Sequence, residues 1–343
     1  MRLSHALSFR LASRSAALLA ALVVVFLAGC GNTSANANQH HLTVGLTYIP
    51  NIQFAPFYVA QELGYYKDAG LNVTLRHHQF SEGEFDAIAA GKEDAVFGGG
   101  DEMLQARDHK ISLVYVANVY TKYPVALMVP ANSPIKTAAD LRGHTIGIPG
   151  QFGETYFGLL ALLQNAGLKA SDVTMQNIAF TQVAALLGNK VDAVMGYLNN
   201  EAIQFQQANF AVRTLALSDV VQPLPLVSNG LGALQSELDA HPDDIKALVA
   251  ATMRGVQYTI AHPQDALNIS KKYVDGLDDS KNAANALAVL QATIPMWQDT
   301  ATSSGHNDPN TWQAMEAFML QYGLISTQMD ASQAFSNDYL PQG

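Results

Sequence analysis

Short apolar runs alternate with amphipathic stretches along most of the chain, which is the pattern of α/β architecture with a largely parallel sheet. The apolar runs predict strands, and the stretches between them carry apolar residues at helical spacing. The predicted strands are 42–47, 72–76, 95–97, 112–119, 145–148, 173–178, 193–195 and 212–217. The predicted helices between them are 56–66, 85–90, 102–109, 154–165, 182–187 and 200–208.

The pattern changes near Ser236, after which the chain is mainly helical. Pro242, Pro263 and Pro309 stand where helices are expected to begin, a position that proline tolerates well. We expect this C-terminal part to pack outside the strand-containing part. Its predicted helices are 242–261, 263–273, 280–294 and 310–322.

Two parts of the chain resemble each other. The motif at 68–71 is echoed at 165–168, and Asp-Ala-Val-Phe-Gly at 94–98 returns as Asp-Ala-Val-Met-Gly at 192–196. The matches keep their order at an offset of about one hundred residues. The repeat favours two related lobes.

The N-terminus has the charge order of an export signal. Arg2, Arg10 and Arg14 precede an apolar run at 16–28, and no acidic residue comes before it. The run is shorter than the stretch of about 20 apolar residues that a membrane-spanning helix needs. We therefore predict a signal peptide at residues 1–29.

Cys30 is the only cysteine in the chain and follows this signal directly. The sequence Leu27-Ala28-Gly29-Cys30 resembles the bacterial lipobox, in which cleavage precedes a cysteine that is then lipidated. The alternative is an ordinary signal peptide with an incidental cysteine. The resemblance predicts lipidation at Cys30, a tether at 30–41 and attachment to a membrane through the lipid.

Charge excludes one class of main partner. Removing 29 signal residues from 343 leaves 314, with 16 basic and 29 acidic side chains and a formal charge of −13. Such a surface repels polyanions, so we do not expect nucleic acid as a partner. The length suits two lobes.

Several segments resemble a known family, the thiamine-pyrimidine-precursor-binding (NMT1/SsuA-like) periplasmic binding proteins of ABC importers. Riboflavin, nitrate, sulfonate and taurine binders share its general plan. The resemblance covers nearly all of the chain after the signal. The matching segments are 48–51, 54–60, 64–71, 140–143, 150–153 and 197–201.

The resemblance implies a type II periplasmic-binding-protein-like α/β fold with two lobes. Each lobe would hold a parallel-type sheet, with a cleft between the lobes and a helical C-terminal tail. Lobe 1 would comprise residues 42–129 plus 228–343, and lobe 2 residues 130–227. We expect a monomer that binds a small molecule and then docks on an ABC permease with its ATPase.

Ligand would contact loops at the carboxyl ends of the strands. These loops are rich in aromatic rings and carboxylates, and Lys122 is their only cation. The candidate ligand-binding residues are Tyr48, Asn51, Phe54, Gly99, Asp101, Tyr120, Tyr123, Phe152, Gly153, Glu154, Thr155, Tyr197, Asn199 and Glu201.

The charge of these loops bears on the ligand. A sulfonate or nitrate needs strong donors such as arginine, whereas Asp101, Glu154 and Glu201 would repel an anion. An aminopyrimidine can donate to a carboxylate and stack on an aromatic ring. We expect Tyr48 to stack on the ring and Glu201 to accept from its amine, although Glu201 could instead complement a helix dipole. Riboflavin and sulfonate, nitrate or taurine remain alternatives.

The main alternative from another class is an enzyme, because fungal relatives make the thiamine pyrimidine from a histidine and bound pyridoxal phosphate. Those synthases carry a lysine and a histidine after the glycine-and-aspartate turn, where this chain has Asp101-Glu102. We expect no catalysis and no cofactor. The adjacent pairs His40-His41 and His77-His78 point to opposite faces of an extended chain, so we expect no metal site. A purely structural surface lipoprotein is a third class.

Overall fold

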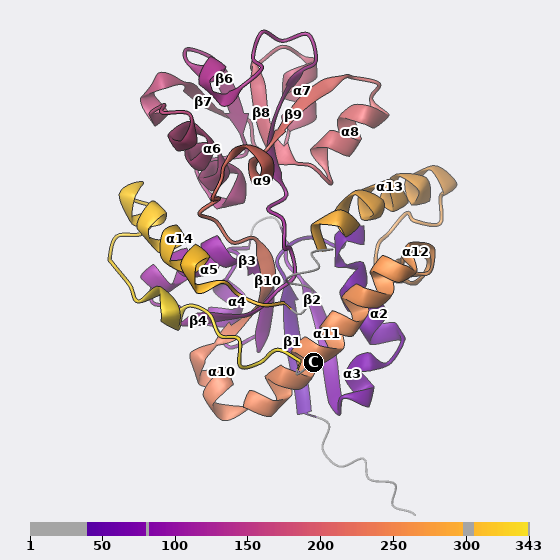
Figure 1. The fold of residues 1–343 in the computed structure, drawn as a ribbon. Helices are drawn as coiled ribbons and strands as arrows, with labels where there is room; N and C mark the ends of the chain where they lie inside the picture. Colours follow the sequence, from indigo (N-terminus) through magenta and orange to yellow (C-terminus); the bar gives the residue numbers. More distant parts are fainter. Residues whose placement is uncertain (1–39, 80–81, 298–304, 342–343) are drawn as a thin grey trace, which may run out of the picture. The chain divides into compact units, whose positions relative to one another are not determined.

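The computed structural model describes residues 40–79, 82–297 and 305–341. The predicted signal peptide, Cys30 and most of the tether lie outside these residues. Residues His40–Gly343 form one compact unit. It contains two five-stranded sheets, each with helices on both faces (Figure 1).

The first sheet is mixed. β10 runs antiparallel to both of its neighbours, while β2, β1 and β3 are parallel. In spatial order the strands are β2 (Leu71–His77), β1 (His40–Leu46), β3 (Ala95–Gly99), β10 (Asn229–Leu234) and β4 (Leu113–Asn118).

The second sheet repeats this topology. Its fourth strand, β5, is antiparallel to both neighbours, and β7, β6 and β8 are parallel. The order is β7 (Thr174–Asn177), β6 (Thr145–Ile148), β8 (Ala193–Tyr197), β5 (Val125–Pro130) and β9 (Val212–Ala216). The predicted α/β class with two related sheets is confirmed. The expected parallel-type sheets are mixed, because each receives its fourth strand from the chain as it crosses between sheets.

The chain crosses between the sheets twice. It leaves the first sheet after Asn118 and enters the second at Val125, then leaves after Ala216 and returns at Asn229. The expected lobe boundary near residue 228 falls within the return segment, and the division into two lobes stays a prediction. At the first crossing the sequence analysis placed the boundary between the lobes at 129/130. In the structure, β5 begins before that boundary and already pairs with strands of the second sheet.

Helix positions follow the predicted pattern. The predicted helix 56–66 is divided at Gly64, whose φ of 76° is left-handed. The helices before β10 are α2 (Ala55–Glu62), α3 (Tyr65–Asp68), α4 (Asp86–Ala89), α5 (Gly100–Asp108), α6 (Gly153–Asn165), α7 (Gln182–Leu187), α8 (Glu201–Gln207) and α9 (Leu217–Val220). Short 3₁₀ helices are η1 (Ile52–Phe54), η2 (Ala138–Leu141), η3 (Ala170–Asp172) and η4 (Ala331–Gln333).

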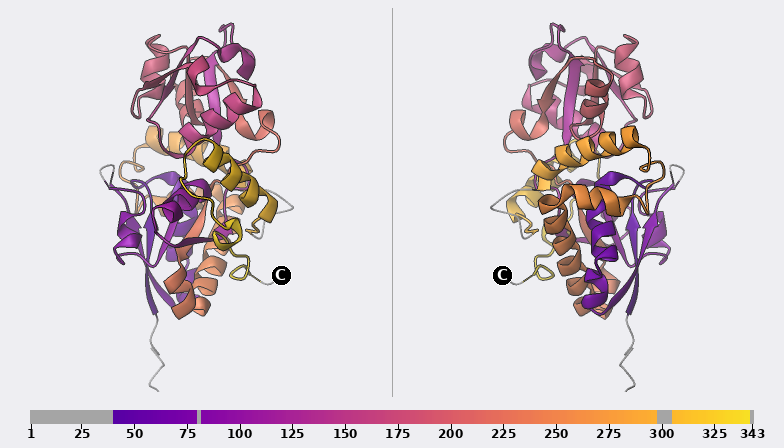
Figure 2. Two further views of the ribbon diagram at one scale, coloured as in Figure 1. Left: turned by 90° about the vertical axis from the view of Figure 1, so that its left-hand side faces the viewer. Right: turned by 90° about the vertical axis from the view of Figure 1, so that its right-hand side faces the viewer.

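The part after β10 is helical, as predicted. Proline opens three of its helices, at Pro242, Pro263 and Pro309. α11 packs on α2 (Figure 2), where a Cβ on Gly255 would lie 2.2 Å from the Pro56 carbonyl oxygen. These helices are α10 (Gln235–Ala240), α11 (Pro242–Ala261), α12 (Pro263–Ser270), α13 (Ser280–Trp297) and α14 (Pro309–Gln321). Across the described ranges, no helix has both the length and the apolar character needed to span a bilayer.

Candidate ligand-binding site

Four acidic side chains gather beside the carboxyl ends of strands from both sheets. Asp101 and Glu102 lie in the first turn of α5 after β3, and Glu154 lies in the first turn of α6 after β6. Glu84 comes from the loop before α4. Asp101 and Glu154 are fully buried, and the other two are half-buried. We call Glu84, Asp101, Glu102 and Glu154 the acid cluster.

Glu154 is held by hydroxyl and amide donors. Tyr197 Oη donates to its Oε2 at 2.8 Å, and Ser228 Oγ donates to its Oε1 at 2.6 Å. Asn229 Nδ2 lies 3.3 and 3.4 Å from the two oxygens. Ser228 directly precedes β10 of the first sheet and Asn229 begins it, whereas Glu154 follows β6 of the second sheet. The carboxylate therefore joins loops of both sheets.

Asp101 is held in a similar way. Tyr123 Oη lies 2.7 Å from Asp101 Oδ2 and 3.2 Å from the Glu154 carbonyl oxygen, while the Glu102 amide donates to Asp101 Oδ1 at 2.8 Å. Tyr123 lies in the first crossing segment, between β4 and β5. A single residue of the crossing thus contacts the first turns of α5 and α6.

Glu84 and Glu102 hydrogen-bond to each other through their carboxyl groups. Such a bond requires a proton on one of them, since an ionised carboxylate only accepts. Gly153 lies against this pair: its φ is +69°, and a Cβ there would come within 2.9 Å of Glu102 Oε1. Only glycine permits both the left-handed backbone and the close approach.

Burial raises the pKa of every acid in the cluster. It raises the pKa of Glu84 to about 8 and that of Glu154 to about 7. The pKa values of Asp101 and Glu102 also lie well above their usual range, through burial first and the neighbouring carboxylates second. Within the described part of the chain, no lysine or arginine forms a salt bridge with these four acids. The cluster therefore offers carboxyl oxygens to ligand donors and, among the described residues, no paired cation that would hold an anion.

Tyr48 and Glu201 form a second group of predicted ligand-binding residues. Burial, then the charge of Glu201, raises the pKa of Tyr48, so the two lie within electrostatic range. The Glu201 carboxylate accepts from the Tyr197 amide at 2.7 Å and from Asn200 Nδ2 at 2.9 Å. Both oxygens thus have partners within the β8–α8 loop, and a ligand contact by Glu201 stays a prediction.

A surface hollow of about 240 Å³ is lined in part by residues that are close in sequence to Tyr48 and Glu201. Asn51 caps η1 by accepting from the Gln53 amide at 3.1 Å, and Asn200 precedes α8. The buried Asn199 donates to Thr293 Oγ1 of α13 at 3.0 Å, so α13 contacts the loop of the second sheet. The hollow is lined by Asn51, Ile52, Asn200, Gln204, Gln207, Val274, Leu277, Asn285, Ala286 and Val289.

The remaining predicted residues have packing or surface environments. The Phe54 ring meets Phe97 edge-on, and Tyr120 meets Trp297 edge-on. Thr155 is buried, and Phe152 is 56% exposed. Gly99 is buried at the end of β3, where a Cβ would meet the carboxylates of Asp101 and Glu102. The structure thus gathers Gly99, Asp101, Tyr123, Gly153, Glu154 and Tyr197 around the acid cluster.

The sequence analysis did not propose four residues of this network as ligand-binding candidates: Glu84, Glu102, Ser228 and Asn229. Glu102 is adjacent to the predicted Asp101, so their shared first turn was an available signal. Ser228 and Asn229 depend on β10, whose sequence Asn-Gly-Leu-Gly-Ala-Leu has too many glycines to predict a strand. Glu84 lies in a charged loop with no local signal.

The chain is similar to proteins of known family. Residues 51–266, more than half of the chain, match the family described as NMT1/THI5 like. The chain is 34% identical over 315 residues to the riboflavin-binding protein RibY of Chloroflexus aurantiacus, covering 90% of this chain and 89% of that protein. It is 23% identical over 324 residues to the formylaminopyrimidine-binding protein of Halalkalibacterium halodurans, covering 92% and 96%.

The fold has solved counterparts. The periplasmic aliphatic sulphonate binding protein SsuA from Escherichia coli superposes with a TM-score of 0.69 at 18% identity, covering 87% of this chain and 97% of that one. Identity at that level establishes the fold alone. From the family match and the relatives, the chain belongs to the NMT1/THI5-like family, as a substrate-binding protein with the fold of periplasmic binding proteins.

Proposed function

We propose that this protein captures a neutral, flat heterocycle rich in hydrogen-bond donors, with riboflavin as the first candidate, for an ABC importer. The observation that carries the proposal is the acid cluster. Its carboxyl groups come from loops of both sheets and have no lysine or arginine salt-bridge partner among the described residues. A ligand seated against them gains by supplying donors.

Charge separates the candidate ligands. A sulfonate needs strong donors such as arginine, whereas Asp101 and Glu154 have no lysine or arginine salt-bridge partner among the described residues and repel an anion wherever they are ionised. Riboflavin is neutral, and its ribityl hydroxyls and imide N–H can donate to carboxylates. Its ring system can stack on tyrosines such as Tyr48 and Tyr197.

The relatives shift the preference among neutral heterocycles. The sequence analysis favoured a thiamine pyrimidine precursor over riboflavin. The 34% identity to a riboflavin-binding protein, against 23% to a formylaminopyrimidine-binding protein over similar coverage, supports riboflavin first. A pyrimidine precursor is the second candidate, since an aminopyrimidine offers the same donor chemistry.

The proposed mechanism is closure of two lobes, one around each sheet. Ligand binds the loops of one sheet and recruits those of the other, which shifts an open and closed equilibrium by its differential affinity. The closed form docks on a permease whose ATPase supplies the work. We further propose export and attachment to the membrane through a lipid on Cys30.

Catalysis is the alternative class. A synthase of the pyridoxal-phosphate kind needs a lysine for the Schiff base, and Glu102 follows Asp101 where the fungal enzymes carry other residues. An acid at this position supports a binding role. Incubating the protein with pyridoxal phosphate tests the alternative, and formation of a pyrimidine product would contradict the binding role.

Calorimetric titration tests the proposal. The full-length protein in detergent is titrated at neutral pH with riboflavin, hydroxymethylpyrimidine, formylaminopyrimidine, thiamine and taurine. We expect one saturable site for riboflavin and no heat of binding for taurine. Tight taurine binding, or no binding of any heterocycle, would contradict the charge argument.

A further inference from the structure

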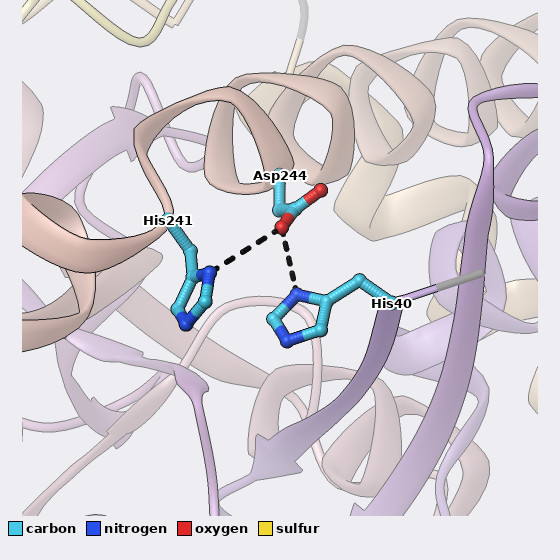
Figure 3. A group of neighbouring side chains, drawn as sticks. All are labelled: His40, His241 and Asp244. Carbon is cyan, nitrogen blue, oxygen red and sulfur yellow. Dashed lines mark ion pairs between the residues drawn. The ribbon is translucent and has the colours of Figure 1, made fainter. Parts of the chain in front are cut away.

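Two histidines and an aspartate from distant parts of the chain lie together at the start of α11 (Figure 3). His40 begins β1, while His241 and Asp244 stand three residues apart at the helix start. Asp244 Oδ2 is 2.7 Å from His40 Nδ1 and 3.8 Å from His241 Nδ1. The two imidazole rings face each other with centroids 4.3 Å apart.

These distances suit a bound metal ion. In a tetrahedral zinc site with metal–ligand bonds near 2 Å, neighbouring ligand atoms lie about 3.3 Å apart. The two observed separations fall on either side of that value, and all three potential ligand atoms lie within 4.8 Å of one another. Small side-chain rotations would bring them to coordination distance.

The hydrogen bonding of the group leaves ligand atoms unused. Asp244 lies close to His40 Nδ1 but outside its hydrogen-bonding direction, so this buried nitrogen has no hydrogen-bond partner among the described residues. Glu237 Oε1 is likewise buried without a hydrogen-bond partner in the described ranges. The buried His40 nitrogen is therefore available to coordinate an ion.

We propose that His40, His241 and Asp244 bind a divalent transition-metal ion, with Zn²⁺ the best match to two imidazoles and a carboxylate.

The ion would join the start of β1 to the start of α11. His40 lies at the amino end of β1, whereas the acid cluster lies beside the carboxyl ends of the strands. The proposed metal site is therefore separate from the ligand site. Its effect would be to hold the amino end of β1 against the start of α11.

The chain contains a matched control for this site. His241-Pro242-Asp243-Asp244 opens α11, and His262-Pro263-Gln264-Asp265 opens α12 with the same spacing. The two histidines have nearly the same backbone, with φ of −134° and −133°. Only the first motif belongs to a three-residue group with metal-ligand geometry among the described residues.

Zinc titration tests the proposal. The full-length protein, made without a histidine tag and stripped of metal with a chelator, is titrated with ZnCl₂ by calorimetry, and Co²⁺ absorption reports tetrahedral coordination. We expect about one equivalent of zinc to bind and to raise the melting temperature. His241→Ala and Asp244→Asn should each weaken binding at least about tenfold, because losing even a group that only orients a ligand costs that much.

A control variant and a second variant of a proposed metal ligand complete the test. His262→Ala should leave the zinc affinity unchanged. His40→Gln should weaken zinc binding, and it replaces His241→Ala in the test if that variant does not fold. Equal affinity in wild type, His241→Ala and His40→Gln, or an equal loss in His262→Ala, would mean an adventitious ion only and would overturn the proposal. Riboflavin titration of His241→Ala should match wild type, which keeps this test separate from that of the proposed function.

Discussion

Glu154 accepts hydrogen bonds from Tyr197 and Ser228, residues that belong to the loops of different sheets. We expect Glu154→Gln to weaken riboflavin binding about tenfold, because a charge-assisted hydrogen bond contributes about 1.5–3 kcal/mol. The matched control is Glu316→Gln on α14, a buried acid outside the cluster that accepts from the Met329 amide. Fluorescence titration of both variants checks the prediction, and equal affinities would contradict it.

Both carboxylate oxygens of Glu201 have nitrogen donors in the structure, whereas the sequence analysis expected this side chain to accept from a ligand amine or to complement a helix dipole. In Glu201→Gln, an NH₂ group replaces one of these two acceptor oxygens. That NH₂ group would face an N–H donor, so one hydrogen bond would be lost and two donors would be placed against each other. We expect a loss of about 1–3 kcal/mol in the free energy of unfolding without ligand. Urea unfolding measures this loss. Unchanged stability together with weaker riboflavin binding would contradict it and would support the predicted contact between Glu201 and the ligand.

Prediction from sequence identified three side chains, directly after or at the end of a strand, that the structure brings together, and their contact with a ligand stays a prediction. Asp101, Glu154 and Tyr197 follow or end parallel strands and all enter the network, as the rule for carboxyl ends implies. It could not find the contact between His40 and His241, which are distant in the chain and meet only through folding. Glu84 was missed for the same reason.

At the scale of elements, Gly153 brings the start of α6 against Glu102. Gly153→Ala adds both left-handed strain and a contact at 2.9 Å, whereas Gly167→Ala at φ +67° adds strain with nothing within 4 Å. We expect Gly167→Ala to lower the free energy of unfolding by about 1 kcal/mol. Gly153→Ala should lower the free energy of unfolding by more than Gly167→Ala does, and it should also weaken riboflavin binding. Chemical unfolding and ligand titration of the pair compare the two, and equal behaviour would show that the approach to Glu102 is unimportant.

Element prediction failed at the two antiparallel strands. β5 is an unbroken apolar run with no alternation, and β10 has glycine at positions 230 and 232. Both strands acquire their conformation from neighbours on each side, since each pairs with two strands. Helices that begin at proline were located closely because their start signal is local.

For the whole molecule, the acid cluster implies a pH-dependent stability. Raised pKa values of about 8 for Glu84 and about 7 for Glu154, against 4.5 for an ordinary glutamate, mean that the folded state binds more protons than the unfolded state between these values. Stability should therefore fall as the pH rises from about 5 to about 8. Thermal melting of ligand-free protein across this range measures the slope.

Two variants test the source of this slope. Glu84→Gln should flatten it, because the variant removes a carboxyl group that must ionise while buried. Asp108→Asn is the control: Asp108 has its pKa lowered to about 2 by hydrogen bonds from Thr327 and Ser326, so its contribution is constant above about pH 5. A slope unchanged by Glu84→Gln, or flattened equally by Asp108→Asn, would show that the cluster does not cause it.

The most direct test of the proposed binding role is a crystal structure of the protein with riboflavin. We expect the ligand between the loops of the two sheets, with at least one hydroxyl or imide donor within hydrogen-bond distance of Glu154 or Asp101. A riboflavin bound elsewhere, with the hydrogen bonds of Tyr197, Ser228 and Tyr123 unchanged, would contradict the role of the acid cluster.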